Sequence, residues 1–152
     1  WILEKLPKHF SKIVVLEYNP TFGFDLEITI PTKSNFNRTK YHYSNLCFGM
    51  SFKAALNLMN KKGFYFIGSN LLRNNAFFIS KKYKKEIFFK NLNINTSKSN
   101  ILSNFRESRD KNKKLNYLNG INKLKEILNC KVVDLNNKNK KIFKIRDLMI
   151  KN

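Results

Sequence analysis

The chain has 152 residues, of which 42% are hydrophobic and 14% aromatic, and it carries a formal net charge of +20. This size and composition fit one domain with a buried core and exclude an intrinsically disordered chain. No apolar run approaches the roughly 20 residues of a membrane-spanning helix, so we expect no membrane span and a cytoplasmic location.

The positive charge is unevenly distributed along the chain. Residues 1–80 hold 10 Lys and Arg against 4 Asp and Glu, whereas residues 81–152 hold 20 against 6. A strongly basic segment is one footprint of nucleic-acid binding. The 23 Asn and the many Lys are, however, also typical of an A+T-rich coding sequence. A basic module that contacts nucleic acid through its tail is therefore kept as an alternative function.

The first elements predicted along the chain are a helix and a strand. Residues 1–10 are typical of the end of a helix that Pro7 closes. The unbroken apolar run 13–16 predicts a strand over residues 13–18 that is covered on both faces, as in a parallel sheet. The connection 20–48 is long and aromatic, with a short strand in LEITI, and a connection of this length is more often functional than idle.

The middle of the chain has the clearest periodicity. Apolar residues at helical spacing predict a helix over residues 50–62, which Ser51 caps and Gly63 ends. Two strands, 64–69 and 75–80, follow, and the short turn between them requires an antiparallel pair. This order predicts the closing half of an α/β sheet with one reversed strand at its edge.

The pattern weakens beyond residue 81. A charged connection leads to a short helix that ends near FRESRD, and INKLKEIL predicts an amphipathic helix. KVVDL and KKIFKI then predict a hairpin. We therefore divide the chain into an α/β unit, residues 1–82, and a basic tail with two short helices and a terminal hairpin, residues 83–152.

The cysteines and histidines form no recognisable motif. Cys47 and Cys130 are far apart and neither belongs to a CxxC pair, so two packed, reduced thiols are expected. His9 and His42 lie outside any HExxH or Cys/His cluster, and no metal site is predicted.

Several phrases resemble a known family. LEYNPTFG, YHYSNLCFG, GSNLLRNNAFF and FRESRD, together with the order of elements over residues 1 to about 80, resemble the C-terminal part of S-adenosylmethionine-dependent methyltransferases of the FkbM-like group. The resemblance implies an α/β fold in which residues 13–18, 64–69 and 75–80 are the last three strands of a Rossmann-like sheet. It also implies S-adenosylmethionine as cofactor and a hydroxyl of a small molecule or sugar as methyl acceptor.

The sequence departs from this family in the cofactor-binding segment. The family's glycine-rich loop and ribose-binding acidic residue are not found, and the five glycines are scattered at positions 23, 49, 63, 68 and 120. Glycines of that loop allow the backbone to approach a ligand closely. Because the chain begins with Trp1 inside a helical pattern, we expect it to be a piece that lacks most of the cofactor site.

Polar residues at the end of the 13–18 strand form the first candidate site. Ligands of open α/β sheets bind beyond the carboxyl ends of strands. Glu17 is therefore predicted as a catalytic base, and Tyr18 and Asn19 as substrate-binding residues. The alternative is that these residues cap the strand and shape the next turn.

The connection 20–48 supplies the second candidate site. His42 titrates near neutral pH and is the other candidate base, while Arg38, Tyr41 and Tyr43 are predicted to bind substrate. The alternative is a loop packed by its own aromatic residues. A non-catalytic remnant with a structural or partner-binding role also remains open.

Overall fold

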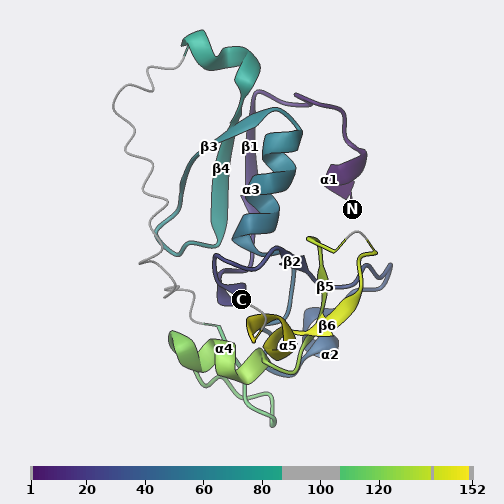
Figure 1. Ribbon diagram of the computed structural model, residues 1–152. Coiled ribbons are helices and arrows are strands. Elements are labelled where there is room, and N and C mark those ends of the chain that lie inside the picture. The colour runs from purple at the N-terminus through teal and green to yellow at the C-terminus, as the bar shows by residue number, and fades with distance from the viewer. Residues whose placement is uncertain (1, 87–106, 138, 151–152) are drawn as a thin grey trace.

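The computed structural model describes residues 2–86, 107–137 and 139–150, which form a mixed α/β structure with two small antiparallel sheets (Figure 1). The first sheet has the strand order β1–β4–β3 and the second the order β2–β5–β6. The strands are β1 (Ile13–Glu17), β2 (Ile28–Thr29), β3 (Phe64–Ser69), β4 (Asn75–Ser80), β5 (Lys131–Asp134) and β6 (Ile142–Lys144). The helices are α1 (Ile2–Lys5), η1 (Pro20–Phe22), α2 (Arg38–Tyr41), α3 (Phe52–Lys61), η2 (Lys81–Glu86), α4 (Ile121–Ile127) and α5 (Ile145–Met149). In the described parts, no helix is long and apolar enough to cross a bilayer.

The first sheet contains the strands that the sequence predicts, in a different order. β4 pairs antiparallel with β3, as expected from the short turn between them, and antiparallel with β1 on its other side. β1 and β3 therefore run in the same direction. The expectation of a reversed strand at the edge is wrong, because β4 is the central strand and β1 occupies its second edge.

Burial of β1 also differs from the prediction. Residues 13–17 alternate between exposed and partly buried, and Ile13 and Val15 are 54% and 58% exposed. Val14 and Leu16 point the other way and pack against the core of the first sheet. A half-exposed antiparallel sheet has one covered face, so the run of apolar residues does not indicate a strand buried on both faces.

Helix α3 follows its sequence signals closely. The Ser51 hydroxyl oxygen accepts a hydrogen bond from the Ala54 amide at 3.2 Å, so the predicted cap is confirmed. The helix ends before Gly63, whose φ is +85°. Its buried side chains pack against those of the first sheet, and this core contains Tyr18, Phe52, Ala55, Met59, Phe64, Ala76 and Phe78.

The basic tail packs against the connection 20–48. The predicted terminal hairpin is present as β5 and β6, but it is followed directly by α5, which the sequence did not predict. β2 adds to the other edge of β5. The shared core contains Phe22, Leu26, Ile28, Leu46, Cys47, Ile127, Cys130, Val132, Ile145 and Leu148.

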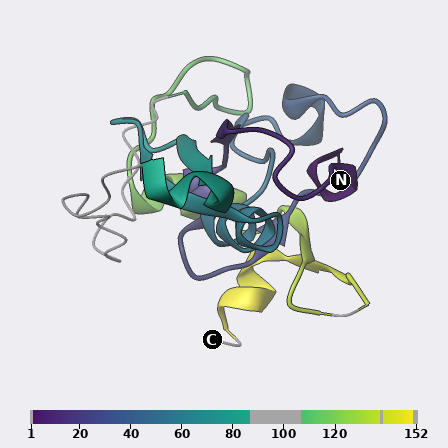
Figure 2. The same ribbon diagram turned by 90° about the horizontal axis from the view of Figure 1, so that it is seen from above.

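Viewed from above, the C-terminal segment and the green segment that precedes α4 lie on opposite sides of α3 (Figure 2).

The two predicted helices of the tail have different outcomes. The amphipathic helix is confirmed as α4. The helix predicted to end near FRESRD lies mostly outside the described residues, and residues 107–110, which are described, form no helix. The division of the chain after residue 82 stays a prediction, although the tail shares its core with the connection 20–48.

Gly63 gives the first testable prediction. A Cβ atom there would lie 2.3 Å from Cε1 and 2.6 Å from Nε2 of His9. A left-handed backbone costs a non-glycine residue about 1–2 kcal/mol. We expect Gly63→Ala to lower the free energy of unfolding by more than about 2 kcal/mol, because the His9 ring must also move.

Gly49→Ala is the matched control for urea denaturation of both variants. Gly49 also has a positive φ, of +61°, but an added Cβ would meet nothing within 4 Å. It should therefore show the conformational cost alone. Equal losses in the two variants would contradict the expected contact with His9.

Candidate functional site

The two predicted bases are not in contact. Glu17 is exposed at the end of β1 and lies opposite Asn75 of β4. Within the described part of the chain, no hydrogen bond or ion pair joins it to His42. Each candidate base therefore has to be considered in its own surroundings.

Tyr18 belongs to the core of the first sheet. It is 1% exposed, and its ring packs against Phe52 with the ring centroids 4.9 Å apart. Burial raises the pKa of the Tyr18 phenol, while a hydrogen bond with Ser69 and the nearby Arg73 charge act in the opposite direction. In this position Tyr18 stabilises the end of β1, and its predicted contact with substrate stays a prediction.

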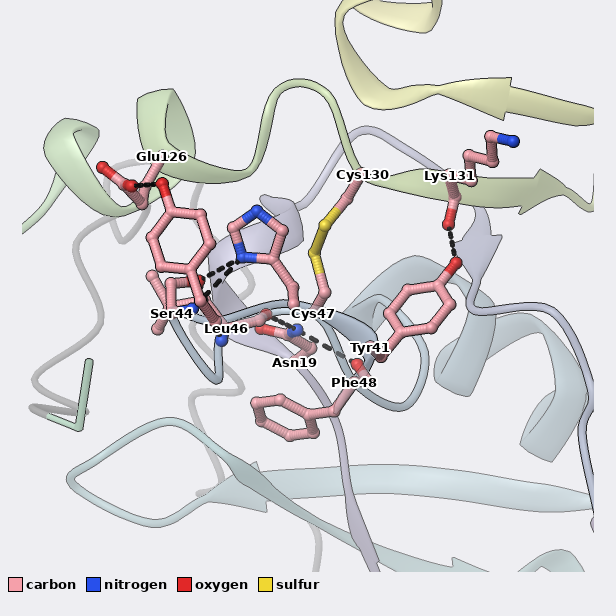
Figure 3. Close-up of a disulfide and its surroundings, with 11 residues drawn as sticks. Asn19, Tyr41, Ser44, Leu46, Cys47, Phe48, Glu126, Cys130 and Lys131 are labelled. Atoms are coloured by element: carbon pink, nitrogen blue, oxygen red, sulfur yellow. Dashed lines mark hydrogen bonds between the residues drawn. A yellow bond between two sulfur atoms is a disulfide. The ribbon is translucent and has the colours of Figure 1, made fainter. Parts of the chain in front are cut away.

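Asn19 joins the end of β1 to a loop of residues 42–49 that follows α2. Its Nδ2 donates hydrogen bonds to the carbonyl oxygens of Leu46 at 2.6 Å and Phe48 at 3.0 Å (Figure 3). Its Oδ1 accepts one from the Thr21 amide at 3.0 Å. The residue is completely buried. All three side-chain hydrogen bonds are internal, which supports the structural alternative for Asn19.

The same loop begins with His42 and Tyr43, which form a small polar network. The His42 Nδ1 lies 2.7 Å from the Ser44 Oγ, and the imidazole stacks on the Tyr43 ring at 4.5 Å. Burial lowers the pKa of His42, although the Glu126 charge opposes this effect. The Tyr43 hydroxyl donates a hydrogen bond to Glu126, which raises the Tyr43 pKa to about 12. A neutral imidazole at neutral pH is the form that can accept a proton or bind a metal.

A disulfide lies next to this network. Cys47, in the loop, is bonded to Cys130, which directly precedes β5 (Figure 3). This corrects the expectation of two reduced thiols. The two sulfurs and a ring nitrogen of His42 all lie within 4.8 Å of one another. We call His42, Cys47 and Cys130 the Cys–His cluster.

Sequence reasoning missed the cluster because nothing in the sequence links its members. The two cysteines are separated by 83 residues and neither has a paired motif. They meet because the hairpin of β5 and β6 packs on the connection 20–48, a contact that local patterns do not encode. Disulfides are characteristic of oxidising compartments, so the cytoplasmic location stays a prediction.

Arg38 and Tyr41 of α2 make internal contacts. The Arg38 guanidinium pairs with the Glu107 carboxylate at 2.6 Å and lies 4.8 Å from the centre of the Phe48 ring. The Tyr41 hydroxyl donates a hydrogen bond to the carbonyl oxygen of Lys131 at 2.6 Å. These contacts join the connection 20–48 to the tail, and the predicted binding of substrate by Arg38, Tyr41 and Tyr43 stays a prediction.

A cavity of about 880 Å³ lies between α3, the segment around α1 and the second sheet. Five lysines and two glutamates contribute to the lining of this cavity, and most of its other lining residues are apolar. None of the predicted site residues lines it. The lining residues are Glu4, Lys8, Glu27, Thr29, Ile30, Pro31, Thr32, Lys33, Phe36, Gly49, Met50, Ala54, Leu58, Lys61, Lys62, Val133, Leu135, Lys140 and Ile142.

Binding of S-adenosylmethionine stays a prediction. Gly23, Gly49 and Gly68 lie in separate segments, and an added Cβ at any of them would meet nothing within 4 Å. The space beside Gly63 is filled by His9.

Comparison of the chain with protein-family models, curated proteins and solved structures finds no match. The resemblance to methyltransferases therefore stays a prediction from the sequence.

The structural role of Asn19 can be tested by removing its side chain. Asn19→Ala leaves two buried carbonyl groups and one amide without their partner, and an unsatisfied buried group costs about 1–3 kcal/mol. We expect a loss of about 3 kcal/mol in the free energy of unfolding, measured by urea denaturation.

Asn37→Ala is the matched control, because Asn37 caps α2 with a 2.9 Å hydrogen bond from the Lys40 amide but is exposed. Asn37→Ala should lower the free energy of unfolding by about 1 kcal/mol. A similar loss in both variants would argue against a special structural role for the buried Asn19 side chain.

The Arg38–Glu107 pair predicts a pH dependence. The Arg38 hydrogen bond holds the Glu107 pKa below its ordinary value of 4.5. A lowered pKa means that the pair stabilises the fold above about pH 4.5 and that this contribution disappears as the pH falls through the folded-state value. Since both side chains are partly exposed, we expect Glu107→Gln to cost about 0.5–1 kcal/mol at pH 7.

The measurement is urea denaturation of wild type and Glu107→Gln at pH 7 and pH 3. The difference between the two proteins should shrink at pH 3, where protonation has weakened the pair. Asp25→Asn, at an exposed carboxylate, controls for general loss of negative charge. A difference that stays constant with pH would contradict the ionic contribution.

Proposed function

We propose that this chain supplies the acceptor side of an S-adenosylmethionine-dependent methyltransferase that modifies a hydroxyl of a small molecule or sugar. The observation that carries the proposal is the first sheet. β1, α3, β3 and the reversed β4 follow one another in the order that the resemblance implies, and α3 packs against the sheet. The cofactor-binding cradle lies outside what these residues provide, so the chain's own contribution is to position the acceptor and take its proton.

The exposed side of β1 supports a larger sheet. β1 is an edge strand whose outward-facing Ile13 and Val15 are more than half exposed. Among the described residues no strand pairs with the outer edge of β1, and the free N–H and C=O groups of such an edge favour pairing with a further strand. That strand would place Glu17 at an interior strand end. Ile13 and Val15 project from one face of the sheet, so a layer packed on that face would cover them.

The cavity is a separate candidate site, because neither Glu17 nor His42 lines it. Its volume of about 880 Å³ lies within the usual range of small-molecule sites. Five lysines against two glutamates in its lining favour a small molecule that carries an anionic group. The acceptor on which Glu17 and His42 act is therefore not placed in this cavity.

Glu17 and His42 have different roles in this proposal. Transfer to oxygen requires a base that takes the hydroxyl proton and a rigid position for that base. Glu17 is at the end of a strand, whereas His42 is in a loop that contacts the tail. Glu17 is therefore assigned as the base, and His42 as a residue that holds the acceptor.

The test is methyl transfer by the complete encoded protein, using labelled S-adenosylmethionine and a panel of sugars and sugar phosphates. We expect Glu17→Gln to lower turnover by at least ~100-fold, the low end of the gain from a positioned base. We expect His42→Ala to raise the Michaelis constant for the acceptor at near-constant turnover, as loss of uniform binding does.

Asp25→Asn is the matched control, since it removes an exposed carboxylate of the connection 20–48. Near-normal turnover in Glu17→Gln with lost turnover in His42→Ala would reverse the two roles. Absence of labelled product with every hydroxyl acceptor, in a protein that is folded by circular dichroism, would overturn the proposed function.

A further inference from the structure

The Cys–His cluster brings together three good metal ligands from two distant parts of the chain. One ligand atom from each of His42, Cys47 and Cys130 lies within 4.8 Å of the others. Two thiolates and an imidazole are a donor set that Zn²⁺ binds well. The donor set is observed whether or not the chain takes part in methyl transfer, although His42 has a part in both proposals.

The spacing is close to that of a zinc centre. With Zn–S near 2.3 Å and Zn–N near 2.0–2.1 Å, a tetrahedral ion separates its ligand atoms by about 3.5–3.8 Å. The cluster requires the two sulfurs to move apart once their bond is cleaved, and their Cα atoms are 6.8 Å apart. That separation is at the wide end of the range for disulfides, so side-chain rotation suffices to open the pair around an ion.

The backbone on both sides of Cys47 is fixed by a buried group. The Asn19 amide bonds the carbonyl oxygens of Leu46 and Phe48, the two neighbours of this cysteine (Figure 3). Cys47 itself is completely buried. The backbone at Cys47 is therefore held in place by contacts that do not depend on the disulfide, while its sulfur can move by side-chain rotation.

The backbone around Cys130 is held in a similar way. Its amide donates to the Ile127 carbonyl at 2.8 Å, and its own carbonyl accepts from the Ile145 amide at 3.1 Å. The carbonyl of the next residue, Lys131, accepts the hydrogen bond from Tyr41. Locked ligand positions of this kind are what a metal site requires.

The orientation of His42 also fits metal binding. Its Nδ1 lies 2.7 Å from the Ser44 Oγ, and Ser44 is completely buried. A metal-binding histidine ordinarily has its second ring nitrogen held by such a partner. In the oxidised chain the Ser44 amide donates to Nδ1 at 3.3 Å, so Nε2 carries the ring hydrogen. Binding of an ion through Nε2 requires the other tautomer, in which Nδ1 donates to the Ser44 Oγ instead.

We propose that the Cys–His cluster is a redox-switched zinc site, which binds Zn²⁺ through His42 Nε2, Cys47 Sγ and Cys130 Sγ when the disulfide is reduced. A dithiol reductant supplies two electrons and two protons to cleave the S–S bond and is itself oxidised to a disulfide. Binding of Zn²⁺ then displaces the two thiol protons, and water completes the four ligands. Oxidation of both thiolates by a disulfide of the same class returns the S–S bond and releases the ion.

The test uses the whole chain, with Co²⁺ as a spectroscopic probe and Zn²⁺ as its competitor. After reduction with a phosphine, one Co²⁺ per chain should give the visible bands of a tetrahedral ion and a thiolate-to-cobalt charge-transfer band. Zn²⁺ should abolish both signals. The oxidised chain should give neither signal.

Variants identify the ligands. Cys47→Ser should remove most of the charge-transfer band, and His42→Ala should weaken Co²⁺ binding by more than the ~10–100-fold expected for loss of the supporting Ser44 hydroxyl in Ser44→Ala. His9→Ala is the matched control, because the His9 Nδ1 also lies 2.8 Å from a serine hydroxyl, that of Ser80, and no cysteine is grouped with it. It should bind Co²⁺ like wild type.

Circular dichroism of the same samples covers the case in which reduction unfolds the chain. Zn²⁺ should then restore the spectrum of the oxidised protein, because binding energy at such a site is folding energy. A reduced chain that binds no Co²⁺ and is not refolded by Zn²⁺ would overturn the site. Equal Co²⁺ binding in His42→Ala and His9→Ala would do the same.

Discussion

One buried amide, that of Asn19, determines how the two sheets are placed relative to each other. Asn19 lies where the chain leaves β1, and its side chain donates hydrogen bonds to the carbonyl oxygens on both sides of Cys47. Its backbone amide donates to the Met50 carbonyl at 2.7 Å, just before α3 begins. Because Met50 is also bridged to Thr29 of β2, one residue connects the end of β1, the loop, the start of α3 and the second sheet. A polar side chain in this position is structural because every one of its hydrogen-bonding atoms has a partner in the fold.

Elements with local signals were predicted well from the sequence. The hydroxyl of Ser51, the positive φ of Gly63 and the short turn before β4 act within a few residues of one another, and α3, β3 and β4 appear where these signals place them. Contacts between distant segments were not predicted. β2 and β5 are joined across about a hundred residues, and the two cysteines across 83. A single sequence does not show which of its distant segments will contact one another.

The candidate site shows a second limit of sequence patterns. A polar residue at the end of an apolar strand has the same appearance whether it faces a ligand or ties down a loop, and here Asn19 does the second. Four apolar residues in a row likewise do not distinguish a strand buried on two faces from an edge strand with one exposed face. For β1 the difference has a consequence, because the exposed Ile13 and Val15 leave one face of the sheet open to a further packed layer.

The disulfide and the candidate base are linked through the same loop. His42 follows α2, whose Tyr41 is bonded to the residue after Cys130, so the imidazole and both sulfurs depend on one set of contacts between the loop and the tail. An ion on Nε2 would occupy the lone pair that a general base needs, which leaves proton removal to Glu17 at the end of β1. Both proposals therefore use His42, as a residue that holds the acceptor in one and as a metal ligand in the other, whereas Glu17 belongs to the first. In the oxidised chain the His42 ring is hydrogen-bonded to Ser44 and stacked on Tyr43, and the redox state of the cysteines would then determine whether its imidazole can contact an acceptor.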